Sequence, residues 1–101
     1  MVKHIILWNL KASYSNSEKE EIRKNIKRSL EGLKGKIPGL IDIRVQTEHL
    51  PSSTADLMLD STFESAEALA GYSVHPEHVK VADTIVRPHT ERRACLDFEI
   101  K

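Results

Sequence analysis

Four side chains in this sequence are candidates for proton-transfer chemistry, and three of them lie close together in the chain. Tyr72, His75 and His78 lie around a predicted interruption between two helices at Val74-His75-Pro76. His4 lies near the start of the chain. A histidine in the first turn of a helix feels the positive end of the helix dipole, and partial burial also disfavours its charged form. We therefore expect His78 to be mostly neutral at pH 7 and able to act as a base.

A tyrosine beside such a base suits proton abstraction next to a carbonyl. Tyr72 would donate a hydrogen bond to the carbonyl oxygen as negative charge develops on it, while His78 accepts the proton and His4 orients either group. This chemistry needs neither a metal ion nor an organic cofactor, and we expect neither. In a competing, structural interpretation, His75 and His78 tie a helix start to a sheet and Tyr72 fills the edge of the core. Composition and spacing alone favour the structural interpretation.

The spacing His75-x-x-His78 resembles a pair of metal ligands. Because no carboxylate or cysteine ligand accompanies the pair at a suitable spacing, the sequence predicts no metal site. Cys95 is the single cysteine, which excludes an internal disulfide and a cysteine-rich zinc site. We expect it to be a small buried thiol without activation.

Length and composition predict one soluble domain spanning residues 1–101. The chain has 40% hydrophobic and 30% charged residues, which is ordinary for a globular protein. Its 15 basic and 15 acidic residues give a net charge of zero, which argues against nucleic acid or an anionic membrane as a partner. The apolar run Ile5–Trp8 is too short for a signal core or a membrane span, so we expect a cytoplasmic protein.

Hydrophobic periodicity places these candidate residues on a short series of strands and helices. A capping box at Ser17-Glu18-Lys19-Glu20 opens a helix, and apolar residues then recur at helical spacing as far as Ile37. Proline at the first helical position favours a new helix from Pro76. The predicted strands cover residues 2–11, 40–48, 55–63 and 92–100, and the predicted helices cover 17–37, 65–72 and 76–86.

This order predicts an α+β, ferredoxin-like βαββαβ fold. One four-stranded antiparallel sheet with its helices packed on one face satisfies the order with short, right-handed connections. Apolar residues on alternating strand positions and on one helix face are expected to form the core between sheet and helices. These residues are Leu57, Leu59, Ile22, Ile26, Leu30, Leu96 and Phe98.

The first strand is apolar on both of its faces. His4, Ile6, Trp8 and Leu10 alternate with Ile5 and Leu7. The helices can cover only one face, so the second would be exposed in a monomer, with Leu40 and Met58 as neighbours. An exposed apolar patch of this kind usually marks an interface. We therefore predict a homodimer in which two sheets face each other.

The helix-facing side of the sheet could instead enclose a site for a small apolar or aromatic ligand. Trp8 could either fill the core or cover a pocket. A cavity of about a few hundred Å³ with His78 accessible would favour a ligand, whereas a filled site would favour structure alone. The residues expected to line such a site are Ile6, Trp8, Leu57, Leu59 and His75.

Several segments resemble the stress-responsive α/β-barrel (Dabb) family. They are Val2–Leu7 (VKHIIL), Thr62–Ser65 (TFES), Tyr72–Val79 (YSVHPEHV) and Arg93–Glu99 (RACLDFE). The resemblance covers almost the whole chain. It implies a ferredoxin-like fold that dimerises sheet to sheet into a barrel.

The resemblance also implies candidate functions. The family includes olivetolic acid cyclase, a cofactor-free polyketide cyclase in which a tyrosine and a histidine matching Tyr72 and His78 carry the chemistry, with a strand histidine matching His4 nearby. A further histidine of that cyclase corresponds to Leu57 here. Three functions therefore stay open: binding of a small ligand, cofactor-independent cyclisation or isomerisation, and a monooxygenase of the wider dimeric-barrel group. The last is the least favoured, because Trp8 and Asn9 are adjacent and point to opposite faces of one strand.

Overall fold

The computed structural model describes residues 1–101 as a single sheet covered by helices. Two short segments with altered helical geometry follow the third helix: a π-helical turn, η1, and a 3₁₀ turn, η2. No helix is long and apolar enough to cross a membrane. In chain order the elements are β1 (Val2–Leu10), α1 (Asn16–Glu31), β2 (Leu40–Gln46), β3 (Leu57–Phe63), α2 (Ala66–Val74), α3 (Pro76–Val81), η1 (Ala82–Val86), η2 (Arg87–His89) and β4 (Thr90–Glu99).

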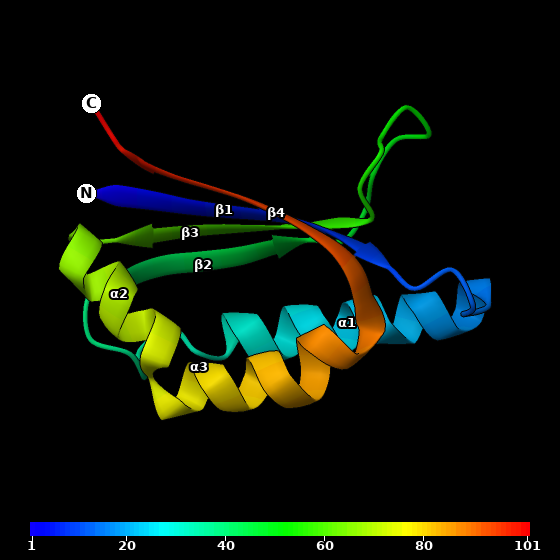
Figure 1. Cartoon of the computed structure of the whole chain (residues 1–101), viewed down its shortest axis with the longest axis horizontal. Helices are drawn as coiled ribbons and strands as arrows, with labels where there is room; N and C mark the ends of the chain where they lie inside the picture. Colours follow the sequence, from blue (N-terminus) through cyan, green and yellow to red (C-terminus); the bar gives the residue numbers. More distant parts are fainter.

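The four strands form one antiparallel sheet in the order β2-β3-β1-β4. All of the helices lie on one side of this sheet, and α1 runs beside the α3–η1 segment (Figure 1). The two outer strands, β2 and β4, are the edges. This arrangement confirms the ferredoxin-like fold predicted from the order of the elements.

The N-cap of helix α1 lies two residues earlier than predicted. Its N-cap is Ser15, whose side chain accepts a hydrogen bond from the Glu18 backbone N–H, while the Glu18 carboxylate accepts one from the Ser15 N–H. The capping box is therefore Ser15–Glu18 rather than Ser17–Glu20. The helix ends at Glu31, but Leu33 and Ile37 stay buried in the turns that follow it.

The core confirms most of the predicted residues and corrects two of them. Ile26, Leu30, Leu57 and Leu59 are buried, and Ile22 packs against them from a half-buried position. Leu96 and Phe98 do not belong to this core: they are 63% and 44% exposed. The strand register explains the error, because Leu96 pairs with Ile5 and Phe98 pairs with Lys3, and residues directly opposite in a sheet point to the same face.

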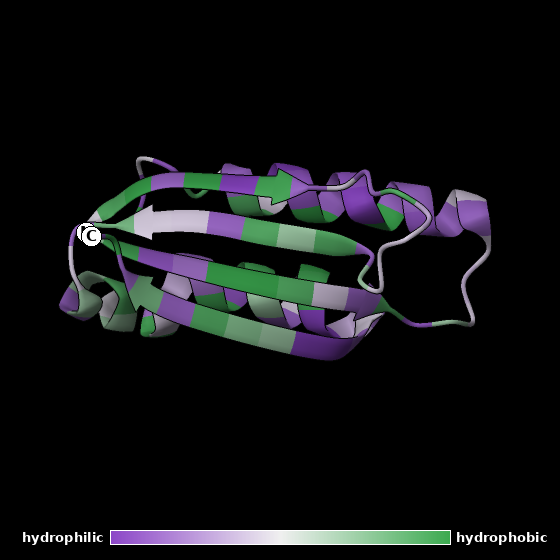
Figure 2. Cartoon of the chain, turned by 90° about the horizontal axis from the view of Figure 1, so that it is seen from above, coloured by the Kyte–Doolittle hydropathy of each residue, from purple (hydrophilic) through white to green (hydrophobic).

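The face of the sheet without helices is apolar along β1 and β4. Figure 2 views the sheet from this side, with the helices behind it. Leu7, Leu96 and Phe98 are exposed here, while Ile5 and Met58 are half-buried. The prediction that Leu40 also lies on this face is wrong, because Leu40 is buried in the core on the other side of the sheet. The shift of register between Leu40 and Asp42 breaks the simple alternation of β2 at this point.

Candidate functional site

A cavity of about 90 Å³ lies between the sheet and the chain segment from α2 to the start of β4. Ile6, Trp8 and Leu59 give it an apolar wall on the sheet side, and Ala82 and Val86 of η1 add to this wall from the helical side. A π-helical turn such as η1 is often found at functional sites. Polar groups also face the cavity: those of His4, Tyr72, Ser73, His78, Arg87, Thr90 and Arg93.

The break between α2 and α3 brings Tyr72 and His78 together. Tyr72 lies in the last turn of α2, and His78 lies in the first turn of α3. Between them, His75 has an extended backbone (φ −66°, ψ 132°), because the residue before Pro76 is pushed out of helical geometry. The two rings stack with their centroids 4.0 Å apart and their planes inclined by 33°.

Both of these side chains have a buried polar atom without a partner. Tyr72 is only 1% exposed, and its hydroxyl makes no hydrogen bond with the protein. The Nδ1 atom of His78 is also buried and unpaired. Buried side-chain polar atoms are paired in the great majority of cases, so two unpaired ones in one cavity need an explanation.

Burial moves the pKa values of the Tyr72 hydroxyl and the His78 imidazole further from pH 7. It lowers the pKa of His78; nearby Arg87 acts in the same direction, and the nearby backbone of Ser73 and Tyr72 acts against it. It raises the pKa of Tyr72, although the charge of Arg93 partly opposes this. At pH 7 the site therefore holds a neutral imidazole beside a protonated phenol, which are a base and a hydrogen-bond donor.

His4 enters the site from β1 and is held by Asp97. The two residues are cross-strand partners, and His4 Nδ1 lies 2.5 Å from Asp97 Oδ1. The carboxylate orients the imidazole ring, whose centroid lies 6.1 Å from that of Tyr72. The structure thus brings together His4, Tyr72 and His78, the three residues predicted to form a catalytic group.

Cys95 lies beside His4 and Asp97. It is exposed, so the expectation of a buried thiol is wrong. It belongs to β4, an edge strand whose residues are almost all exposed. Its Sγ atom lies 3.8 Å from His4 Nδ1 and donates to Asp97 Oδ1 at 3.5 Å. Partial desolvation and the Asp97 charge raise the pKa of the thiol, so Cys95 is not activated as a nucleophile.

The remaining predicted site residues divide into two groups. Ile6, Trp8 and Leu59 line the cavity. Leu57 is buried in the core without lining the cavity, and His75 caps α3, where its Nδ1 accepts a hydrogen bond from the Glu77 backbone N–H. Since His75 uses Nδ1 for the cap while His78 faces the cavity, the two histidines do not form a common ligand pair.

Sequence reasoning missed Asp97, Arg87 and Arg93. The alternation of residues 92–100 by itself places Asp97 only on the polar face of its strand. Its role depends on the pairing of β1 with β4, which places it opposite His4 and places Arg93 opposite Trp8. The sequence does contain one signal, because Arg93, Cys95 and Asp97 alternate with the apolar residues of β4 and so share a face.

Comparison with known proteins identifies the family. Residues 2–100 match the Stress responsive A/B Barrel Domain (Dabb). The chain belongs to this family. It is 32% identical over 101 residues to the stress-response A/B barrel domain-containing protein HS1 of Arabidopsis thaliana, covering 97% of this chain and 88% of that protein. The comparison therefore confirms the resemblance to the Dabb family found in the sequence segments.

Solved structures agree with this assignment. A dimeric protein of unknown function from Bacteroides fragilis, with a ferredoxin-like fold, is 34% identical with a TM-score of 0.90, covering 98% of this chain and 95% of that one. A hydroxynitrile lyase from Passiflora edulis is 19% identical with a TM-score of 0.74, covering 99% and 93% of the two chains. At this identity, the likeness to the lyase shows a shared fold alone.

Proposed function

We propose that this Dabb protein binds a small molecule in the cavity between β1 and the α2–α3 helices. The observation that carries the proposal is the pair of buried, unpaired polar atoms, Tyr72 Oη and His78 Nδ1. Leaving a buried polar group without a partner costs about 1–3 kcal/mol. A ligand oxygen would satisfy the Tyr72 hydroxyl, and a ligand donor or acceptor would satisfy His78, according to its tautomer.

The size of the cavity restricts the ligand. Its volume of about 90 Å³ corresponds to roughly three water molecules in the liquid. This is smaller than the few hundred Å³ expected for a ligand-binding site. The buried part of the ligand is therefore a small apolar or aromatic group with one polar function, and any larger part extends through the mouth of the cavity.

A second candidate function is proton transfer without a cofactor. It is favoured by the neutral His78 imidazole stacked on the protonated Tyr72 phenol. In this reaction His78 would take a proton from the carbon next to a substrate carbonyl. Tyr72 would donate a hydrogen bond to the carbonyl oxygen as it becomes an enolate. This chemistry is that of an isomerase or of a cyclase that closes a ring by aldol condensation.

The monooxygenase alternative has less support. Trp8 lines the cavity, whereas Asn9 donates a hydrogen bond to the Thr54 carbonyl at the loop between β2 and β3. The two side chains therefore do not form a common pocket. An antibiotic biosynthesis monooxygenase shares the fold with 10% identity, a TM-score of 0.73 and coverage of 100% of this chain and 99% of that one.

The protein is further proposed to act as a homodimer that pairs its open sheet faces. Leu7, Leu96 and Phe98 leave an exposed apolar surface on this face. A monomer rarely leaves such a surface uncovered. The Bacteroides fragilis relative, at 34% identity, is described as dimeric.

A thermal-shift screen tests ligand binding. Small aliphatic and aromatic alcohols, ketones, acids and amides are added to the wild type and to Tyr72→Phe and His78→Ala variants. A compound that binds only the folded protein raises its Tm by mass action. The proposal predicts compounds that stabilise the wild type more than both variants. If no compound stabilises the wild type more than the variants, the proposal fails.

A further inference from the structure

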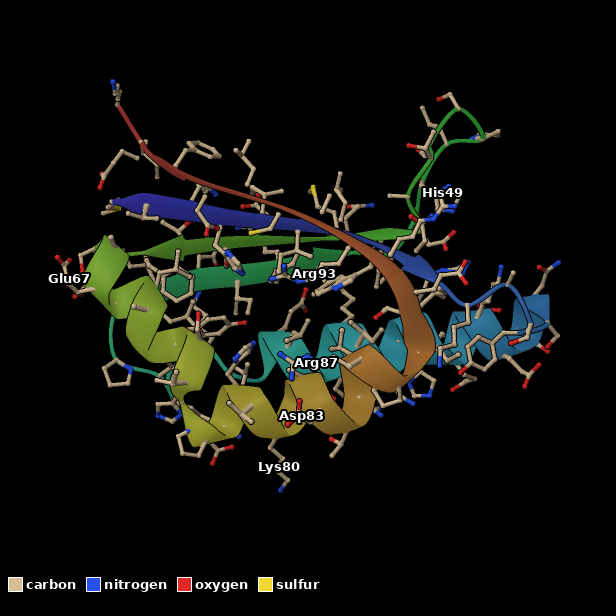
Figure 3. The ribbon with its side chains drawn as sticks, viewed as in Figure 1. His49, Glu67, Lys80, Asp83, Arg87 and Arg93 are labelled. Carbon is tan, nitrogen blue, oxygen red and sulfur yellow. The ribbon has the colours of Figure 1, made fainter.

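Two arginines from different elements line the cavity, and because both are exposed we call their part of it the mouth. Arg87 opens η2, and Arg93 lies on β4. Both side chains line the cavity that contains Tyr72 and His78. Figure 3 shows Arg93 reaching from β4, and Arg87 from the end of the helical segment, into the space between them.

The positive charge at this mouth is only partly balanced by the protein. Arg87 forms an ion pair with Asp83, one helical turn before it. Arg93 has no carboxylate within ion-pair distance, and none of the residues lining the cavity is an aspartate or a glutamate. The chain as a whole has no net charge, so this positive surface is a local feature.

The charge of each arginine reaches the unpaired atoms inside the cavity. Arg93 opposes the effect of burial on Tyr72, and Arg87 disfavours a proton on His78. The guanidinium groups and the unpaired atoms therefore belong to one electrostatic environment. A ligand that reaches Tyr72 and His78 from outside must pass these cations.

We propose that the ligand of this cavity is a small monocarboxylate. Its carboxylate lies at the mouth between Arg93 and Arg87, and its apolar body with any further oxygen lies inside, at Tyr72 and His78. This inference rests on the proposed function and names the class of its ligand. A guanidinium group offers a planar fork of N–H donors that matches a carboxylate, and such charge-assisted hydrogen bonds are among the stronger ones in proteins.

The charge count favours a monoanion over a phosphate. Asp83 already neutralises much of the Arg87 charge, which leaves Arg93 as the one unpaired cation at the mouth. A carboxylate carries one negative charge, whereas inorganic phosphate carries between one and two at pH 7. Inorganic phosphate therefore serves as a competing ligand in the test.

The experiment compares acids with their neutral amides. Butanoate, butanamide, benzoate, benzamide and inorganic phosphate are titrated into the ¹⁵N-labelled protein at constant ionic strength, and binding is followed by the shifts of backbone amide signals. The variants are Arg93→Gln, Arg87→Gln and Tyr72→Phe. Lys80→Gln is the matched control, because Lys80 lies on α3 and points away from the cavity (Figure 3).

The wild type is expected to bind an acid at least about tenfold more tightly than its amide, since a hydrogen bond to a charged group is worth about 1.5–3 kcal/mol. Arg93→Gln removes most of this preference and Arg87→Gln a smaller part, while Lys80→Gln keeps it. The amide affinity falls less than the acid affinity in the arginine variants, because the amide makes only a neutral hydrogen bond there. Tyr72→Phe weakens binding of both acid and amide.

Three outcomes would overturn the inference. Equal binding of acid and amide by the wild type refutes the carboxylate preference and leaves the proposed small-molecule site intact. Phosphate binding more tightly than both acids assigns the mouth to a different anion. If neither acid nor amide shifts signals around Tyr72 and His78, both the inference and the proposed function fail.

Discussion

The rings of Tyr72 and His78 stack 4.0 Å apart because the helix that carries them is broken between them. In an uninterrupted α-helix, two residues six positions apart are turned by about 120° from each other around the axis. Their side chains would then leave the helix on different faces. The extended backbone at His75, imposed by Pro76, redirects the chain so that both rings face the same cavity.

Replacing Tyr72 by phenylalanine should separate stability from binding. The substitution keeps the stacked ring and removes a buried hydroxyl that has no partner. We expect the free energy of unfolding to stay the same or to rise by up to about 1 kcal/mol, because an unsatisfied polar group is lost. Ligand affinity should fall. Urea unfolding measures the first effect, and the NMR titration measures the second.

The other tyrosine gives a matched control. Tyr14 is half-buried, and its ring lies 5.8 Å from that of His89, away from the cavity. Tyr14→Phe should change neither stability nor ligand affinity appreciably. A loss of more than about 1 kcal/mol in Tyr72→Phe would contradict the argument, because it would show that the hydroxyl is satisfied in solution.

His78 should make the stability of the protein depend on pH below neutrality. Its pKa is lowered in the folded state, so in acid the unfolded chain takes up a proton that the folded protein resists. The free energy of unfolding should therefore fall as the pH drops below about 6.5, the ordinary pKa of histidine, and level off once the folded state is also protonated. Urea unfolding at pH 8, 7, 6 and 5 measures this change.

A comparison of two histidine variants tests whether His78 causes this loss of stability in acid. His78→Gln should reduce the loss of stability between pH 7 and pH 5. His49→Gln is the control, because His49 is exposed and lies on the loop after β2 (Figure 3). If His78→Gln keeps the wild-type pH dependence, the buried neutral imidazole is not its source.

The sequence alone was sufficient for the order of the elements but not for the orientation of β4. Alternation shows that a strand has two unlike faces, but it does not say which face meets the helices. On β4 the apolar residues Leu96 and Phe98 face away from the helices, while Arg93, Cys95 and Asp97 lie on the other face, where Asp97 and Arg93 meet the site. Only the pairing with β1 settles this.

Only the part of the candidate site that depends on local sequence could be predicted. His78 and Tyr72 flank a proline, and the effect of a proline on the residue before it is local, so their meeting follows from nearby sequence. Arg87 and Arg93 line the same cavity only through the tertiary fold, since they come from different elements. The size of the cavity likewise depends on how every side chain around it packs.

Truncation of Leu30 tests the packing beneath the site. Leu30 is 2% exposed on α1, and it lines the cavity as well as the core. Leu30→Ala should lower the free energy of unfolding by about 2–5 kcal/mol, measured by urea unfolding. Lys24→Ala, on the exposed side of α1, should change it by less than about 0.5 kcal/mol. An effect near zero for Leu30→Ala would mean that this face of α1 does not pack on the sheet.

A charge placed on the open face of the sheet should separate the homodimer. Leu96 is 63% exposed in the single chain and lies opposite Ile5, at the centre of the apolar part of this face. In a dimer that pairs these faces, Leu96→Glu would bury an unpaired carboxylate in an apolar interface. We expect the dissociation constant to rise by at least about thirtyfold, the equivalent of roughly 2 kcal/mol, because a charged group is costly to bury without a partner.

Sedimentation equilibrium on the wild type and two variants decides this prediction. Val74→Glu is the matched control: Val74 is 75% exposed at the end of α2, on the helical side of the molecule. The wild type and Val74→Glu should sediment as dimers at micromolar concentration, while Leu96→Glu sediments as the 11.5 kDa monomer. A wild type that stays monomeric at high concentration, or a Leu96→Glu variant as dimeric as the wild type, would show that this face is not where two copies meet.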